Sequence, residues 1–145
     1  MTMIEGLAAS IRADFKLFDD WEDRFGFLIE QARELKPLNQ DEHRPENLVR
    51  GCASQVWILC DVDDKNGAPH LRFRADSDAI LVKGLLALLL RLFNDQPAGD
   101  ILAFDARAFM QEIGLGNALT QQRANGLASM LQFIYREATL ATAAK

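Results

Sequence analysis

The most apolar stretch of the chain constrains its fold more than any other feature. Residues 79–93 read AILVKGLLALLLRLF and are broken only by Lys83, Gly84 and Arg91. A membrane-spanning helix needs about 20 consecutive apolar residues, so this segment is too short to cross a bilayer. A helix that is apolar on nearly every side is typical of a protein interior. We therefore predict a helix that is buried inside the domain.

Length and composition predict one globular domain. The chain has 145 residues, of which 49% are hydrophobic and 26% are charged, and it contains no internal repeat and no linker rich in glycine, serine or proline. This length is sufficient to bury a core, so we treat residues 1–145 as a single domain. The net charge of −5 argues against a nucleic-acid partner, which would favour a basic surface.

The N-terminus and the cysteine content bear on the compartment. The first residues, MTMIEGLAASIRADF, contain no basic leader followed by an apolar core, so we expect no secretory signal. Two cysteines in an acidic chain of this kind favour free thiols in a reducing compartment over a disulfide framework. We therefore expect a cytoplasmic protein with no membrane-bound segment.

Hydrophobic periodicity predicts an α+β fold. Residues 54–63 and 69–75 have the composition of strands, and the Asn-Gly pair between them is typical of a β-hairpin turn. We expect a small antiparallel sheet of about three strands, packed against helices. The helices are expected at about residues 2–16, 20–35, 78–93, 97–102 and 106–114, and from residue 120 onward.

Capping residues and a polar segment set the expected boundaries of these elements. Asp19 or Asp20 is expected to cap the second helix, and Asp76 or Ser77 the long apolar helix. Thr120 is expected to cap the last helix. The segment 36–48 is polar and carries two prolines, which predicts a loop. One apolar face of the last helix is expected to comprise Leu127, Met130, Leu131 and Ile134.

The two cysteines occupy different contexts. Alternation in the first strand puts Cys60 on the same face as Ile58, so we expect a small hydrophobic side chain in the core. Cys52 follows Gly51 in a turn, and the adjacent Arg50 favours its thiolate, the form that attacks sulfur. From local chemistry alone, Cys52 is either a reactive thiol or an incidental loop thiol.

A disulfide and a metal site are both disfavoured. Eight positions separate Cys52 from Cys60, and an extended segment of that length far exceeds bonding distance. A zinc site needs three or four ligands, whereas the chain offers only these cysteines, His43 and His70, without the spacing of a ligand set. We expect both histidines on the surface.

Two further polar sets stand out. Asp76, Ser77 and Asp78 precede the apolar helix, and helix capping is the default explanation for them. Arg123 stands four residues before Leu127 and so extends the buried face of the last helix at its N-terminal end, where a cation opposes the helix dipole. Either something other than helix stability selects this arginine, or its stem packs at the edge of the core while its head reaches water.

Four sequence blocks, taken in order, point to a known family. WEDRFGFLIEQARELKPL, VRGCASQVWI, SDAILVKGLLALL and LTQQRANGLASM closely resemble the SufE family, and the resemblance runs from about residue 13 to residue 137. The chain departs from the family pattern at Ala53, where a glutamine is frequent, and at Gln121, where a proline often opens the helix. Neither residue touches the reacting sulfur, although Ala53 could alter partner preference.

The resemblance implies a fold and a set of site residues. SufE-like proteins share an α+β fold with IscU-type scaffold proteins, and they accept sulfur in iron–sulfur cluster assembly. Cys52 matches the acceptor cysteine, which takes the sulfur as a persulfide on a loop that can tuck into an apolar cavity and swing out. Asp76 and Arg123 match an acidic residue and an arginine that are associated with the acceptor site. The cysteine block contributes Arg50, Gly51 and Ser54 as supporting residues.

The resemblance also implies partners. The sulfur donor would be a cysteine desulfurase of the SufS or CsdA type, and the pyridoxal phosphate (PLP) cofactor belongs to that partner. We therefore expect no cofactor and no metal in this chain, which would act as a sulfur carrier and desulfurase activator and not as an enzyme. A scaffold for iron–sulfur clusters or another acceptor would receive the sulfur. The family suggests a monomer or a weak homodimer.

Two alternatives belong to other functional classes. A scaffold that binds a cluster or a metal is suggested by the fold shared with IscU-type proteins, but one accessible cysteine cannot supply the ligands of a cluster. A thiol redox enzyme would use Cys52 as the peroxidatic residue and Cys60 as the resolving residue.

Overall fold

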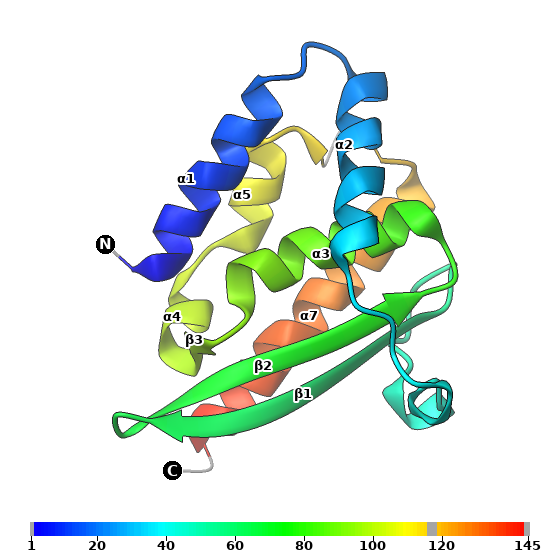
Figure 1. Ribbon diagram of the computed structural model, residues 1–145. Coiled ribbons are helices and arrows are strands. Elements are labelled where there is room, and N and C mark those ends of the chain that lie inside the picture. Colours follow the sequence, from blue (N-terminus) through cyan, green and yellow to red (C-terminus); the bar gives the residue numbers. More distant parts are fainter. Residues whose placement is uncertain (1, 116–118, 144–145) are drawn as a thin grey trace.

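The computed structural model describes residues 2–115 and 119–143 and has the predicted α+β architecture (Figure 1). Two helices come first, a β-hairpin and a long helix follow, and short helices lead to a long C-terminal helix. In chain order the elements are α1 (Met3–Lys16), α2 (Trp21–Glu34), the 3₁₀ turns η1 (Gln40–Glu42) and η2 (Pro45–Asn47), β1 (Val56–Lys65), β2 (Ala68–Ser77), α3 (Ile80–Phe93), β3 (Gln96–Pro97), α4 (Ala98–Ala103), α5 (Ala106–Glu112) and α7 (Gln121–Ala143).

Local capping signals fix the starts of two helices as predicted. The side chain of Asp20 accepts a hydrogen bond of 2.9 Å from the backbone N–H of Asp23, which caps α2. The hydroxyl of Thr120 accepts one of 3.3 Å from the N–H of Arg123 at the start of α7. The segment predicted as a loop contains η1 and η2 and no longer element.

The hairpin carries most of the sheet. Asn66 and Gly67 have φ values of 55° and 80°, the left-handed conformations that a two-residue type I′ turn requires. The antiparallel ladder runs from Val56 opposite Ser77 as far as this turn, so both strands are longer at that end than predicted. The two-residue strand β3 pairs with β2 and gives the sheet the order β1-β2-β3.

Helix α3 is buried, as the apolar stretch predicted, but it is not capped as predicted. Its N-cap residue is Ala79, which makes no side-chain capping hydrogen bond. Asp76 and Ser77 are the last residues of β2, and the Ser77 hydroxyl accepts a hydrogen bond of 3.2 Å from the N–H of Ala79, which precedes the first helical turn, so neither residue is the N-cap. Among the described residues, no helix is long and apolar enough to cross a membrane.

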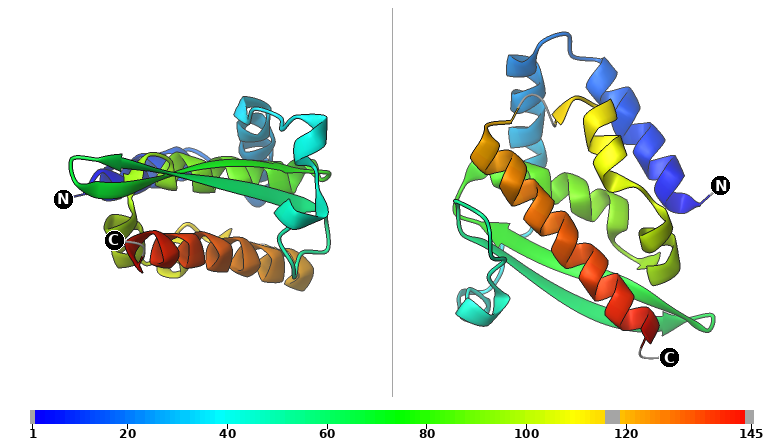
Figure 2. Two further views of the ribbon diagram at one scale, coloured as in Figure 1. Left: turned by 90° about the horizontal axis from the view of Figure 1, so that it is seen from below. Right: turned by 180° about the vertical axis from the view of Figure 1, so that it is seen from behind.

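The elements form two layers around one apolar core. Figure 2 shows α7 across one face of the sheet and of α3, in a second layer that also contains α4. The predicted face of α7 is buried, and strand alternation turns Ile58, Phe73 and Ala75 into the same core. The opposite face of the sheet carries Trp57 and Asp76, and the segment with η1 lies against it.

Helices α2 and α3 approach each other closely at Gly84. A Cβ atom at this position would collide with the carbonyl oxygen of Leu28 in α2 and would lie 2.8 Å from the carbonyl carbon. Backbone atoms cannot rotate away as the end of a flexible side chain can. Glycine therefore sets the distance between the two helices, although it costs the helix about 1 kcal/mol relative to alanine.

We predict that Gly84→Ala destabilises the protein by about 1 to 3 kcal/mol, because overpacking of the helix contact outweighs the gain in helix propensity. The free energy of unfolding in urea measures this change.

Gly26 in α2 is the matched control, since a Cβ atom there would have no neighbour within 4 Å. Gly26→Ala is expected to stabilise the protein by about 0.5 to 1 kcal/mol through helix propensity alone. Equal effects of the two substitutions would contradict the proposed close contact.

Candidate functional site

Cys52 lies in a short loop that leaves the sheet and returns to it. Leu48 forms an isolated bridge with Trp57, and the N–H of Val49 donates a hydrogen bond of 2.8 Å to the carbonyl of Val56. The chain then turns at Gly51, whose φ of 93° is in the left-handed region that favours glycine. We call residues 50–55 the acceptor loop. Its position in a turn before β1 is the predicted one.

The acceptor loop rests on the N-terminal half of α7. The Sγ atom of Cys52 lies 3.6 Å from the carbonyl oxygen of Gly126 and can donate a weak hydrogen bond to it. A Cβ atom at Gly126 would come within 3.6 to 3.9 Å of three Cys52 atoms, and one at Gly51 would collide with the hydroxyl of Ser129. The loop backbone thus packs closely on the helix at two glycines.

The resting environment of Cys52 favours the neutral thiol. Burial raises the pKa of Cys52 above that of an ordinary cysteine. The nearest polar partner of Sγ is a carbonyl oxygen, which accepts a hydrogen from the thiol but repels the thiolate. Arg50 and Arg123 both have exposed side chains. The expectation that a nearby cation holds Cys52 as thiolate is therefore wrong for this conformation.

Arg123 lies in the first turn of α7, one turn before Gly126 and thus close to the cysteine contact. The side chains of residues 121–123 are exposed, whereas Ala124 packs partly buried against the core. The expectation that Arg123 extends the buried face is wrong, because its side chain is exposed. Ser54 is partly buried within the acceptor loop.

Asp76 is a buried carboxylate with three donors around it. Only 6% of the residue is exposed. Its oxygens lie 2.8 Å from Nε2 of His43, 2.9 Å from the N–H of Ser77 and 3.3 Å from Nζ of Lys83. Burial by itself would raise the pKa of Asp76, but the hydrogen bonds from His43 and Ser77 and the charge of Lys83 together lower it. The carboxylate is therefore ionised and fully partnered.

Asp76 and its neighbours hold the acceptor loop and do not touch its sulfur. Strand alternation puts Asp76 on the sheet face that points away from α7, on which Cys52 rests. The Ser77 hydroxyl donates a hydrogen bond of 2.7 Å to the carbonyl of Gln55. Asp78 exchanges two hydrogen bonds with the backbone of Gln55, one of 3.0 Å through its carboxylate and one of 3.3 Å through its N–H. These residues support the site from the sheet side.

His43 is the residue of this region whose role sequence reasoning missed. It was expected on the surface, but its side chain is only 27% exposed and pairs with Asp76. Its ring also meets the ring of Trp57 edge-on, with centroids 4.6 Å apart. The contact joins residues 33 positions apart, so no local pattern in the sequence signals it.

Cys60 belongs to a different part of the molecule. Cys60 was predicted in the core; it packs against the core but is only partly buried. Burial, and then the charges of Glu137 and Asp61, raise the pKa of Cys60 to about 12. Glu137 follows Gly126 by eleven residues in α7, and eleven helical residues span about 16 Å. The two thiols therefore lie too far apart for a disulfide.

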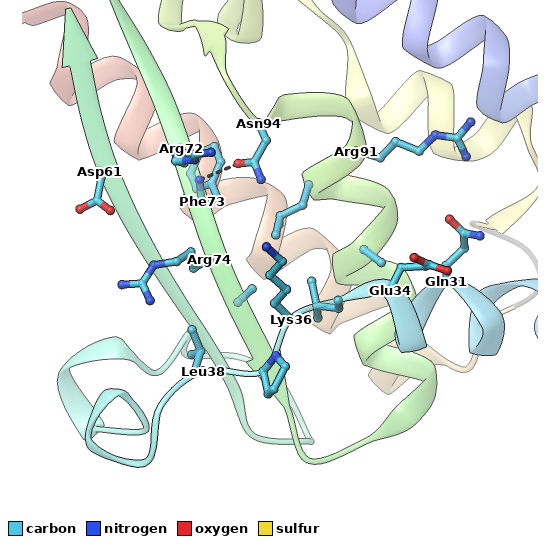
Figure 3. Close-up of a pocket in the computed structure, with 15 residues that line it drawn as sticks. Gln31, Glu34, Lys36, Leu38, Asp61, Arg72, Phe73, Arg74, Arg91 and Asn94 are labelled. Atoms are coloured by element: carbon cyan, nitrogen blue, oxygen red, sulfur yellow. Dashed lines mark hydrogen bonds between the residues drawn. The ribbon is translucent and has the colours of Figure 1, made fainter.

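A cavity of about 800 Å³ lies elsewhere, between the end of α2, the following linker, the hairpin and α3 (Figure 3). Lys36, Arg72 and Arg74 contribute cationic side chains to its lining, while Glu34 and Asp61 contribute carboxylates. Cys52 does not line this cavity. Within residues 2–115 and 119–143, no three histidine, cysteine, aspartate or glutamate side chains gather closely enough to hold a metal ion.

Comparisons with known proteins agree with the resemblance. The family model described as "SufE: Fe-S metabolism associated domain" matches residues 9–138. An uncharacterized SufE-like protein of Rhizobium etli is 43% identical over 131 residues, which cover 90% of this chain and 88% of that protein. A second one, from Rhizobium meliloti, is 41% identical over 125 residues, covering 86% of this chain and 89% of that protein.

A solved structure shows the same fold. The solution structure of a hypothetical protein from Thermus thermophilus has a TM-score of 0.75 at 21% identity and covers 94% of this chain and 96% of its own. At this identity the likeness concerns the fold alone. The family model and the two relatives, which span most of the chain, show that this protein belongs to the SufE family and has a role in iron–sulfur metabolism.

Proposed function

We propose that the protein accepts sulfur on Cys52 from a PLP-dependent cysteine desulfurase and passes it on for iron–sulfur cluster assembly. The observation that carries this proposal is the placement of Cys52: its loop is held at both ends, while its sulfur makes one weak hydrogen bond to Gly126. A thiol placed in this way can leave the helix without disrupting the sheet.

The chemistry is a transpersulfidation. The desulfurase takes sulfur from L-cysteine with its own PLP and carries it as a cysteine persulfide. The Cys52 thiolate attacks the terminal sulfur of that persulfide, so that one S–S bond forms on Cys52, another breaks, and the desulfurase thiolate leaves. The number of S–S bonds is conserved, and no external oxidant or reductant is consumed. This chain would thus be a carrier and an activator, because it regenerates the free desulfurase.

The resting position of Cys52 fits a carrier that should react only with its partner. A neutral, half-buried thiol reacts slowly with solutes, because the thiolate is the nucleophile. After release from α7, the thiol would lose the burial that raises its pKa. The exposed Arg50 and Arg123 would then be available to stabilise the thiolate and the product persulfide.

The wider setting is also part of the proposal. The donor would be a desulfurase of the SufS or CsdA type in the cytoplasm, and a cluster scaffold or another acceptor would receive the sulfur. This chain would dock as a monomer or from a weak homodimer. It would need no cofactor or metal of its own for this transfer.

We predict that Cys52→Ser abolishes both sulfur transfer and desulfurase stimulation. In the assay, the protein is mixed with a cysteine desulfurase and L-cysteine. Intact mass is measured without a reductant, which would cleave the persulfide, and sulfide release is measured in a parallel sample with a reductant. The wild-type chain should gain the mass of one sulfur atom and accelerate sulfide release, while the serine variant should do neither.

Cys60→Ala is the matched control and should behave as the wild type, because Cys60 lies far from the acceptor loop. If Cys52→Ser still gained sulfur, or if Cys60→Ala lost it, the assignment of Cys52 as the acceptor would be wrong.

We also predict the pH dependence of Cys52 reactivity in the isolated protein. Because burial raises its pKa, the thiolate fraction at neutral pH is smaller than for a free cysteine, and alkylation should accelerate through a midpoint above that of an unburied cysteine. Iodoacetamide kinetics between neutral and alkaline pH, in the Cys60→Ala variant, measure this midpoint.

The same variant in urea provides the reference, since unfolding removes the burial and should return the midpoint to about 8.5. A midpoint in the folded protein below that of the unfolded chain would indicate activation by a cation at rest and would contradict the structure.

A further inference from the structure

The last two residues of β2 and the residue after them bind one end of the acceptor loop and the segment that precedes the loop. We call Asp76, Ser77 and Asp78 the clasp. At the downstream end of the loop, Ser77 and Asp78 fix Gln55 through three hydrogen bonds of 2.7 to 3.3 Å. Upstream of the loop, Asp76 binds His43 at 2.8 Å. The clasp therefore links two segments that flank Cys52 in the sequence.

The upstream attachment is organised around Trp57. The ring of His43 meets the indole edge-on at an interplanar angle of 87°. The backbone of Trp57 pairs with Leu48, and across the hairpin Trp57 stands opposite Asp76. His43, Leu48 and the clasp thus meet at one tryptophan near the start of β1. Loss of the His43 contact would loosen the attachment of the segment that leads into the acceptor loop.

The hydrogen-bonding chemistry of the His43–Asp76 pair requires a donor at position 43. An ionised carboxylate can only accept hydrogen bonds, so Nε2 of His43 carries the proton that it shares with Asp76. The Asp76 side chain is 9% exposed, and water cannot readily replace a lost donor there. The His43 side chain is more exposed, so its removal opens no cavity in the core.

We propose that His43 is a positioning residue: through Asp76 it holds the segment that leads into the acceptor loop and sets how often Cys52 leaves α7. The inference deepens the proposed function and rests on it, since only a sulfur acceptor needs this release. In a two-state loop, a contact made only in the docked state reduces the population of the released state. Removal of His43 therefore favours release.

The test measures release without any desulfurase. The wild-type protein, His43→Ala and His43→Gln are treated with iodoacetamide at neutral pH, and the modification of each cysteine is followed by peptide mass spectrometry. His43→Ala should accelerate the alkylation of Cys52 by roughly tenfold to a hundredfold, as expected for loss of a hydrogen bond to a charged group. His43→Gln, whose amide can still donate to Asp76, should restore most of the wild-type protection.

Two controls separate local release from general loosening. Cys60 reports on global opening within the same molecule, and its alkylation rate should stay unchanged in both His43 variants. His70→Ala removes the other histidine of the chain, which lies in β2 near the hairpin turn, and should leave the alkylation rate of Cys52 unaffected.

A double variant tests whether His43 acts through Asp76. In an Asp76→Ala background, His43→Ala should give no further acceleration, because the partner of the imidazole is already absent.

Several outcomes would overturn the inference. These are an unchanged alkylation rate of Cys52 in His43→Ala, an equal acceleration of alkylation at Cys60, no rescue by His43→Gln, or a full effect of His43→Ala in the Asp76→Ala background.

The result of the alkylation test is distinguishable from that of the sulfur-transfer assay. Failure of the alkylation test would remove the role of His43 but leave Cys52 as acceptor, whereas failure of Cys52→Ser would refute the function and leave the loop mechanics intact.

Discussion

The burial of helix α3 is the constraint on which the rest of the structure depends. A helix that is apolar on nearly all sides must be covered on nearly all sides, and α1, α2, the hairpin and α7 provide this cover. Because β2 runs directly into α3, the polar residues at the end of β2 are brought to one edge of the core. The acceptor loop and the N-terminal half of α7 reach the same edge. The site is thus a product of how the chain encloses one helix.

The proposed site combines rigidity and freedom in adjacent residues. The buried, ionised Asp76 and the backbone of Gln55, which accepts a hydrogen bond from the buried Ser77, resist displacement, since each displacement would leave a buried polar side chain without a partner. Cys52 itself is attached by a weak sulfur hydrogen bond and by van der Waals contacts. The contacts at the two ends therefore contribute most of the free energy that holds the loop, whereas the contacts of the Cys52 sulfur contribute little. A partner protein can displace the sulfur from α7 without breaking the contacts at the ends of the loop.

Local signals in the sequence predicted most of the fold. The apolar stretch of α3, the Asn66-Gly67 turn and the cap at Asp20 each depend on neighbours in the chain, and all three are confirmed. The roles of Asp76 and His43 depend on which strands pair and in what register, and a polar residue before a helix looks like a cap until that register is known. The pKa of Cys52 was predicted with the wrong sign for a similar reason, because the adjacent Arg50 is visible in the sequence and burial is not.

The chemical contrast between the two cysteines has a consequence for stoichiometry. Because burial and the charges of Glu137 and Asp61 raise the pKa of Cys60 to about 12, this side chain stays in the thiol form at neutral pH and is a poor nucleophile while the protein remains folded. Under the proposed function, each chain has one exchangeable thiol and can carry one sulfur atom per docking event. Each productive encounter with the donor then transfers one sulfur atom to the chain. A second sulfur atom can be accepted only after the first has been passed on.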